Sequence, residues 1–225
     1  MVGRAAAGLI PLWLKILYSA FVAVLVPYYW ISCSPWNFLF FRDVALLIGL
    51  GAIWTERPLL AGLPAVGLAI PQLLWCLDFL TGARITGMTS YMFESNRSLF
   101  VRGLSLFHGW LPFLLLWMVW RLGYDRRAFW GRTVASTCIL LASYFLAPPP
   151  PAPADHPDYA VNINYVHGLS YEKPQTVMPG LLWLTIMIVG FPMVFCLPAH
   201  LALAACFPWV GRTQANPSPS LDVQV

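Results

Sequence analysis

Long apolar stretches recur along this chain, and each is close to the length that an α-helix needs to cross a bilayer. About 20 mostly apolar residues suffice for one crossing. The predicted spans are Leu12–Ile31, Trp36–Trp54, Pro58–Leu80, Leu99–Trp120, Ala128–Leu146 and Pro179–Phe207. Stretches such as Leu111–Val119 are apolar throughout, whereas barrel strands alternate apolar and polar residues. The pattern therefore predicts an all-α, polytopic transmembrane helix bundle of about six spans.

Several of these spans contain residues that weaken or bend a helix, as Pro64 and Pro71 do in the third. The second includes Arg42 and Asp43, and the fifth is diluted by Arg132 and neighbouring hydroxyl residues. The sixth is long enough to tilt, or to break at Pro192 or Pro198, because proline cannot donate a helical hydrogen bond. We expect the bundle to contain irregular turns at these positions.

The polar connections define the predicted domain organisation. Residues 1–211 are predicted to form one six-span transmembrane domain, and the apolar stretch that starts at Leu9 is expected to be retained as part of the first span rather than cleaved as a signal peptide. The only long connection, about residues 147–178, opens with a proline run that favours extended backbone. Residues 212–225 are predicted to be a disordered tail.

Composition supports a membrane environment and removes several other classes. The chain is 59% hydrophobic and 10% charged, with a mean hydropathy of +0.69, whereas soluble domains carry about 25% charged residues. Its five cysteines include no CxxC pair, so neither a disulfide framework nor a metal site is predicted. The net charge of +4 is spread over the flanks of the spans, which indicates topology rather than nucleic-acid binding.

The positions of the basic residues predict the orientation of the bundle. One side carries Arg4, Lys15, Arg57, Arg121, Arg126, Arg127, Arg132 and Arg212, and the other carries Arg42, Arg84, Arg97, Arg102 and Lys173. Cytoplasmic loops are enriched in Lys and Arg. Eight residues against five therefore predict that both chain ends are cytoplasmic and that the long loop faces outward.

Polar residues from several segments are predicted to gather at the outward end of the bundle. They are Asn37, Arg42, Asp43, Asp78, Arg102, Ser105, His108, Asn162, Asn164 and His167. A charged side chain in hydrocarbon costs about 2.5–3.5 kcal/mol on insertion scales, so such groups normally pair or line a wet cavity. We therefore expect a shared polar cavity at this end.

The four charged residues have a chemical and a structural interpretation. Arg42 and Arg102 are candidates for binding a lipid headgroup or a developing oxyanion, and Asp43 and Asp78 for orienting a catalytic histidine. Alternatively, Arg42 and Asp43 pair with Asp78 and Arg102 and lock the bundle together. Asp78 also lies near a span end, where it could sit in water.

His108 is the strongest candidate for chemistry, because histidine exchanges protons near neutral pH and also ligates metals or haem. Ser105 lies three residues earlier on the same helix face and is a candidate nucleophile. Both residues could instead be hydrogen-bonded packing residues. In the long loop, His167 is a candidate base or a loop cap, and Asn37, Asn162 and Asn164 are candidates for substrate binding.

Established catalytic motifs are absent from the sequence. It contains no HExxH, Walker A, GxGxxG, GxSxG or CxxCH pattern. No cofactor is therefore assigned, and no metal is predicted.

Two short motifs resemble known families. Trp36-Asn37-Phe38-Leu39-Phe40-Phe41-Arg42-Asp43 and Phe107-His108-Gly109-Trp110-Leu111-Pro112-Phe113 are similar to motifs of an uncharacterised family of bacterial integral membrane proteins. They also resemble the androgen-induced-gene family of membrane hydrolases for fatty-acid esters of hydroxy fatty acids. The resemblance implies that His108 matches the family's functional histidine. The family's catalytic threonine falls near Phe40, which cannot be a nucleophile, so Ser105 or an activated water would replace it.

These observations lead to three functional hypotheses. The first is a lipid-modifying enzyme of a bacterial inner membrane, an ester hydrolase or acyl transferase whose partners are membrane lipids. The second is a small-solute or proton-coupled permease, which requires polar residues that continue to the cytoplasmic face. The third is a non-catalytic scaffold or accessory subunit that binds a membrane-protein partner or a second copy of itself.

Overall fold

The computed structural model describes residues 8–95 and 98–209, and within these ranges all regular structure is helical. In chain order the elements are α1 (Leu12–Ser32), η1 (Pro35–Leu39), α2 (Phe41–Thr55), α3 (Pro58–Leu80), η2 (Ser90–Met92), α4 (Leu99–Ser105), α5 (Phe107–Leu122), α6 (Arg127–Leu146), η3 (Ile163–Tyr165), α7 (Gly180–Phe191), the π-helical η4 (Pro192–Cys196) and α8 (Leu197–Cys206). The predicted tail at 212–225, together with Arg4 and Arg97, lies outside the described residues.

Five helical segments in the described part are long and apolar enough to cross a membrane. They are Leu12–Ser32, Pro58–Leu80, Leu99–Leu122, Arg127–Leu146 and Gly180–Cys206. Their bounds lie close to those predicted for the first, third, fourth, fifth and sixth spans. The protein is thus an all-helical chain with five candidate membrane-spanning helices.

The predicted second span, Trp36–Trp54, differs from the structure. The 3₁₀ turn η1 occupies its first residues, Phe40 is extended, and α2 then runs for only 15 residues. Asn164 from the distant long loop explains the break, because its side chain accepts from the Phe41 amide at 3.0 Å and donates to the Leu39 carbonyl at 2.8 Å. A count of six spans is therefore not established by helix length.

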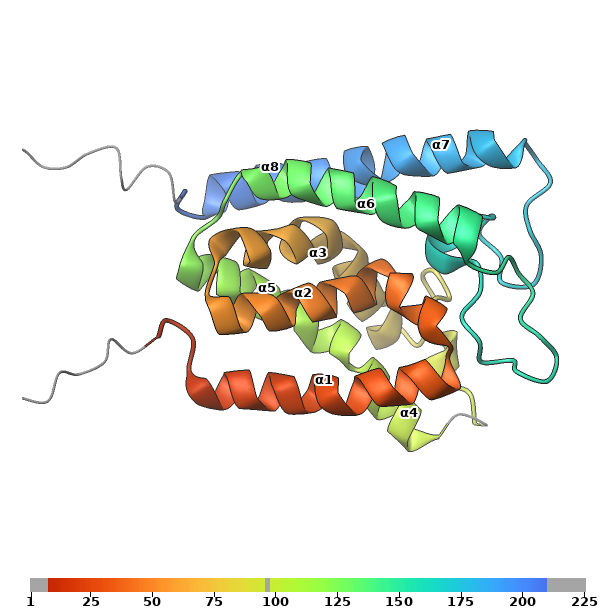
Figure 1. Ribbon diagram of the computed structural model, residues 1–225, viewed down its shortest axis with the longest axis horizontal. Coiled ribbons are helices and arrows are strands. Elements are labelled where there is room, and N and C mark those ends of the chain that lie inside the picture. The colour runs from red at the N-terminus through yellow and green to blue at the C-terminus, as the bar shows by residue number, and fades with distance from the viewer. Residues whose placement is uncertain (1–7, 96–97, 210–225) are drawn as a thin grey trace, which may run out of the picture.

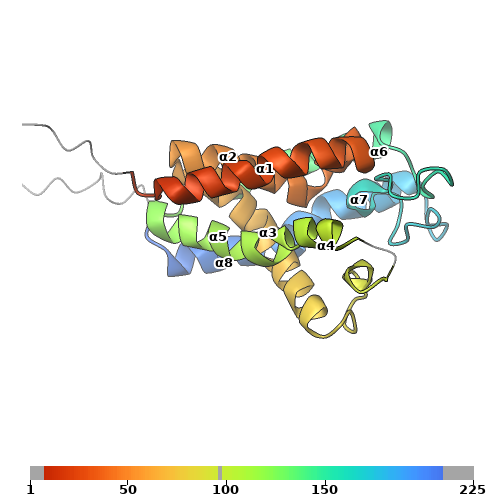
Figure 2. The same ribbon diagram turned by 90° about the horizontal axis from the view of Figure 1, so that it is seen from below.

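The long helices lie side by side along one axis (Figure 1). Both ends of the described chain lie at one end of the bundle, here called the terminal end, together with the α2–α3 and α5–α6 connections. The opposite end, here called the loop end, carries the segments that connect α3 to α4 and α6 to α7. In the perpendicular view, the second half of α3 leans away from the other helices toward its connecting segment (Figure 2).

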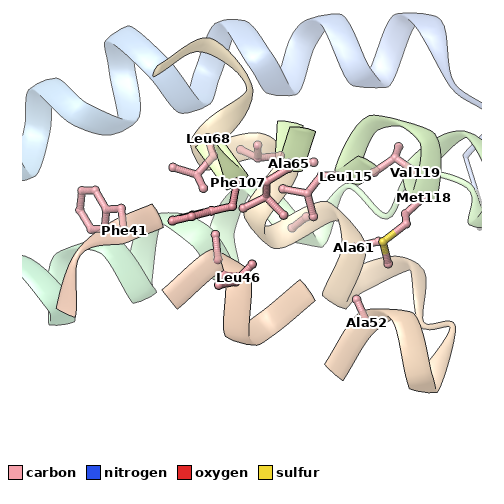
Figure 3. Packing of buried hydrophobic residues seen from close by; sticks show 14 of the residues in the cluster. Phe41, Leu46, Ala52, Ala61, Ala65, Leu68, Phe107, Leu115, Met118 and Val119 are labelled. Atoms are coloured by element: carbon pink, nitrogen blue, oxygen red, sulfur yellow. The ribbon is translucent and has the colours of Figure 1, made fainter. Parts of the chain in front are cut away.

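Helix α3 forms the centre of the bundle. In its most apolar window 56% of the residues are buried, against 22% for α1 and α6. The main apolar cluster is made where α2, α3 and α5 meet, and Figure 3 shows Leu46, Ala65, Phe107 and Leu115 among its members. The exposed apolar side chains of the outer helices suit contact with lipid rather than water.

The sixth predicted span is interrupted in the way that its prolines suggested. Pro192 begins a π-helical turn that ends at Cys196, between α7 and α8. Proline has no amide hydrogen, so it cannot continue the regular ladder of helical hydrogen bonds. A π-turn widens the helix locally, and such turns are frequent at functional sites.

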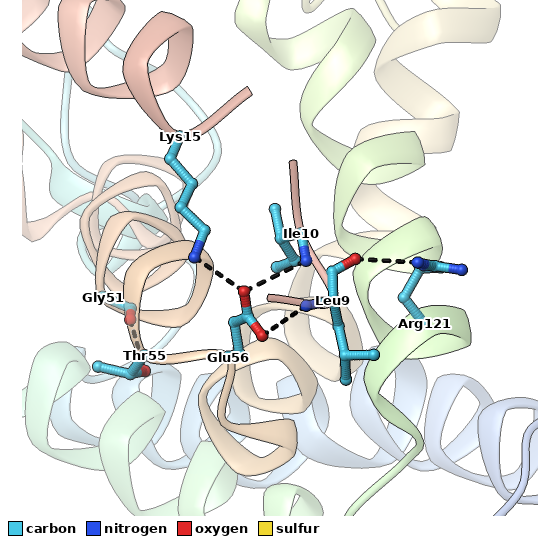
Figure 4. Close-up of polar contacts among 7 residues, drawn as sticks. All are labelled: Leu9, Ile10, Lys15, Gly51, Thr55, Glu56 and Arg121. Carbon is cyan, nitrogen blue, oxygen red and sulfur yellow. Dashed lines mark hydrogen bonds and ion pairs between the residues drawn. The ribbon is translucent and has the colours of Figure 1, made fainter. Parts of the chain in front are cut away.

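At the terminal end, Glu56 fastens the start of the chain to the α2–α3 corner (Figure 4). Its carboxylate accepts from the amides of Leu9 at 2.8 Å and Ile10 at 3.2 Å, and from the Lys15 ammonium at 2.8 Å. The Lys15 hydrogen bond, followed by those of the two amides, lowers the pKa of Glu56. The ionised form is therefore preferred in the folded protein.

We expect Glu56→Gln to lower the free energy of unfolding by about 1 kcal/mol, because three interactions of a carboxylate are weakened. Since the pKa of Glu56 is lowered by folding, its contribution is complete above about pH 4.3 and falls as the pH drops through the folded-state pKa. Thermal unfolding of both proteins between pH 3 and 7 measures this, and the two curves should converge at low pH. The matched control Glu172→Gln should follow the wild type, and parallel curves at all pH values would contradict the assignment.

Candidate functional site

A cavity of about 680 Å³ lies at the loop end of the bundle. Its wall is built from the ends of α1 and α3, the start of α2, the α4–α5 junction and both connecting segments. Its polar and aromatic lining includes Tyr29, Asn37, Arg42, Trp75, Tyr91, Ser105, His108, Tyr165 and Tyr171. Because distant segments meet here, the cavity depends on the fold as a whole.

Arg42 and Asp43 form the charged centre of this region. Arg42 Nε donates to Asp43 Oδ2 at 3.3 Å, and the guanidinium carbon lies 4.2 Å from the centre of the Phe40 ring. Asp43 is 1% exposed, and its Oδ1 has no hydrogen-bond partner among the described residues. Arg42 is partly exposed and lines the cavity. The pair leaves the far side of the guanidinium available to a ligand.

This arrangement differs from the predicted pairing of Arg42 and Asp43 with Asp78 and Arg102. The two residues pair with each other instead. The reason is local, because Arg42 and Asp43 are neighbours in the first turn of α2 and their side chains interact with each other. A carboxylate in this turn is also stabilised by the positive end of the helix dipole. Asp43 therefore orients Arg42 rather than His108.

His108 lies in the first turn of α5 and is 4% exposed. Its ring contacts Phe107 and Trp75, with centroid separations of 4.2 Å and 5.1 Å. Its Nδ1 has no hydrogen-bond partner among the described residues, and Arg42 is close enough to act on it electrostatically. The ring also interacts with the backbone of Ser105. A ring nitrogen without a partner at the edge of a cavity is suited to accept a proton from a ligand or water.

Ser105 also lines the cavity, at the end of α4, but its partner is not the histidine. The side chain of Ser105 interacts with the phenol of Tyr29. Leu106, between α4 and α5, keeps right-handed helical dihedral angles, and Ser105 and His108 both line the cavity. The ring of His108 interacts with the backbone of Ser105, and no hydrogen bond between the ring and the Ser105 hydroxyl is found in the described part.

Asp78 holds a connecting segment in place. Its Oδ1 accepts from the amides of Ile85, Thr86 and Gly87, and its Oδ2 accepts from the amide and hydroxyl of Thr89, at distances between 2.7 and 3.2 Å. Asp78 is 0% exposed and is not part of the cavity lining. With both oxygens occupied, the carboxylate acts as the anchor of a segment whose Gly87 and Tyr91 reach the cavity.

Asn162 and Asn164 shape the long loop that covers the cavity. Asn162 donates to the carbonyls of Gly168 and Ser170 and accepts from the His167 amide. Both asparagines have positive φ, a conformation that this residue type tolerates well. Neither residue lines the cavity. They determine where the lining residues Tyr165 and Tyr171 lie.

The remaining predicted residues have mixed positions. Asn37 is 4% exposed and lines the cavity, whereas Arg102 donates to the carbonyl of Glu94 and stays outside the lining. His167 also lies outside the lining and stacks on Tyr144 at 5.0 Å. Desolvation lowers the pKa of His167, so this histidine is neutral at neutral pH.

Of the ten predicted residues, the cavity therefore brings Asn37, Arg42, Ser105 and His108 together, with Asp43 directly behind Arg42. The aromatic part of the lining was not predicted. Tyr29 belongs to the aromatic run Tyr28-Tyr29-Trp30, and Trp75, Tyr91 and Tyr171 lie in separate segments of the sequence. Only the fold brings these rings together.

Searches of family models, of curated proteins and of solved structures find no match to this chain. The fold and the cavity therefore define its class by themselves. It is a helical protein with five apolar helices of spanning length and a polar, aromatic cavity at one end.

We expect Asp78→Asn to loosen the segment around residues 84–95. The NH2 group of asparagine would replace one carboxylate oxygen and could not accept hydrogen bonds from the backbone N–H groups there. Hydrogen–deuterium exchange in nanodiscs should become at least about tenfold faster there and stay unchanged at the terminal end. Asp125→Asn is the matched control, since Asp125 accepts from the Arg127 amide at the terminal end. Equal exchange at 84–95 in the variant and the wild type would show that Asp78 does not anchor the segment.

Proposed function

We propose that this protein is a membrane-embedded lipid-modifying enzyme, an ester hydrolase or acyl transferase, with its active site in the loop-end cavity. The observation that supports the proposal is the meeting of Arg42 with the buried His108, whose Nδ1 has no hydrogen-bond partner among the described residues, at the wall of that cavity. A proton acceptor beside a fixed positive charge is what acyl transfer from an ester requires.

In the hydrolysis that we propose, His108 takes a proton from water, and the water oxygen bonds to the acyl carbon. The ester C–O bond then breaks, and the leaving alcohol oxygen takes the proton from the imidazole. Arg42 stabilises the oxyanion that develops on the carbonyl oxygen, or binds the headgroup of the lipid. Asp43 keeps the guanidinium in place through the 3.3 Å hydrogen bond.

Water is favoured over Ser105 as the attacking group. Ser105 is engaged with Tyr29, and its hydroxyl makes no described hydrogen bond with His108. A serine nucleophile needs such a bond to lose its proton. In acyl transfer, the hydroxyl of an acceptor lipid takes the place of the water.

The membrane arrangement completes the proposal. We propose that α2 serves as a sixth span, packed within the five longer helices, so that both chain ends lie on the same side. The basic residues near the terminal end, Arg121, Arg126 and Arg127, favour this side as cytoplasmic. The loop-end cavity then faces outward from a bacterial inner membrane, where lipids of the outer leaflet reach it from the side. The resemblance of the Trp36–Asp43 and Phe107–Phe113 motifs to the two membrane families agrees with this proposal.

We expect His108→Ala to lower lipid-ester turnover by about 10²–10⁴-fold, the usual contribution of a general base. The measurement uses detergent-purified protein and a panel of phospholipids, acylglycerols and fatty-acid esters of hydroxy fatty acids. His156→Ala is the matched control, because His156 is exposed in the long loop, and it should keep full activity.

Ser105→Ala separates the two possible attacking groups. Retention of most of the activity supports activated water, and a loss equal to that of His108→Ala identifies Ser105 as the nucleophile. Circular dichroism and unfolding temperatures confirm that each variant is folded. If the wild type turns over no ester of the panel, or if folded His108→Ala keeps its rate, the proposed enzyme is rejected.

A further inference from the structure

A second arginine, Arg132, is enclosed in the bundle at a distance from the cavity. It lies in α6 and is 1% exposed, although the sequence places it among the charges that flank a span. It does not line the loop-end cavity. Arginine stays protonated in proteins, so burial here places a full positive charge among helices.

The surroundings of Arg132 contain rings and a thiol but no carboxylate. Its guanidinium carbon lies 4.7 Å from the ring centre of Phe41 and 5.5 Å from that of Phe191. The thiol of Cys196, a weak acceptor, interacts with the guanidinium. Apart from this thiol, none of the three guanidinium nitrogens has a hydrogen-bond partner among the described residues.

The chain makes room for this arginine in two ways. At Gly67 a Cβ atom would lie 2.0 Å from Arg132 Nε, so only glycine allows α3 to pass so close. Phe191 and Cys196 lie at the two ends of the wide π-helical turn, one just before its first residue and one at its last. The arginine is thus built into three helices rather than left over at a surface.

A polar group follows Arg132 on the same face of α6. Ser136 lies one turn further along, is 0% exposed, and its hydroxyl has no hydrogen-bond partner among the described residues. Both side chains offer hydrogen-bond donors. The ionisable group that acts electrostatically on the guanidinium is a thiol rather than a carboxylate.

We propose that Arg132, with Ser136, binds one small monovalent anion, a halide or a short carboxylate, in the interior of the bundle. An unpaired buried charge costs several kcal/mol even after the protein relaxes, and an anion removes most of that cost. The rings of Phe41 and Phe191 lie next to the guanidinium carbon. The donors at the edge of the planar guanidinium match a carboxylate or halide. The observations that support this site do not include any that support the proposed lipid chemistry.

The test is the unfolding temperature in nanodiscs, followed by tryptophan fluorescence, at constant ionic strength with gluconate exchanged for chloride or formate. In the wild type the unfolding temperature should rise with the logarithm of the anion concentration, by roughly 3–5 °C for each tenfold increase above half-saturation. Arg132→Met should lose this dependence while still folding, since apolar replacement of a buried charge is often well tolerated. Chloride and formate series distinguish the two sources of the anion.

Arg57→Met is the matched control, because Arg57 is an exposed arginine at the terminal end, and it should keep the full anion dependence. Arg42→Met should also keep it, which separates this site from the loop-end cavity. Should Arg132→Met not fold, Arg132→Lys provides the test, with half-saturation raised about tenfold because the planar fork is lost. An unfolding temperature of the wild type that does not respond to anions identifies Arg132 as a cation–π contact only. The proposal is also overturned if the anion dependence survives in folded Arg132→Met or is unchanged in Arg132→Lys. Loss of the anion dependence in Arg42→Met would overturn it as well.

Discussion

Polar groups buried inside a helical bundle must find their partners within the protein or in a ligand, because burial removes them from water. Most of the structure follows from how this requirement is met. Asp78 accepts five hydrogen bonds and thereby folds the α3–α4 connection. Asn164 completes the start of α2, and Glu56 closes the terminal end. These groups have all their hydrogen-bond partners within the protein and are structural. Buried polar atoms without a partner among the described residues, such as those of His108 and Arg132, are better candidates for binding or catalysis.

The lengths of the apolar runs predicted the helices well, because crossing distance is a property of each segment alone. The bounds of α3 agree with the prediction, and those of α1 differ by one residue. The start of α2 could not be predicted in this way. It is decided by Asn164, which is 123 positions away from Phe41 in the sequence. A local pattern contains no information about such a partner.

The sequence predicted which end of the bundle the candidate residues lie at, but not which of them contact one another. Successive helices run in opposite directions, so polar residues near alternate span ends must meet at one end of the bundle. The hydrogen-bond partners of each side chain decide whether it lines the cavity. Asp78 and Asn162 do not, because their side chains bond to backbone groups of the adjoining connecting segments. Arg132 was missed for a related reason. An arginine near a span end ordinarily reaches toward the headgroups, and only its contact with Gly67 in another helix shows that this one turns inward.

Phe41 physically links the two arginines. Its ring packs on Arg132, its amide is held by Asn164, and the next residue in the chain is Arg42. Polar groups also extend toward the terminal end, because Cys196 interacts electrostatically with both Arg132 and Tyr124, and the Tyr124 hydroxyl is 2.7 Å from His200 Nδ1. The permease hypothesis requires polar residues of this kind on the far side of the bundle, and an enzyme does not. An anion at Arg132 that exchanged with solvent at the terminal end would therefore favour a carrier. A permanently bound anion would instead serve an enzyme, because it would fix the position of Phe41. The backbone that presents Arg42 to the cavity would then be fixed as well.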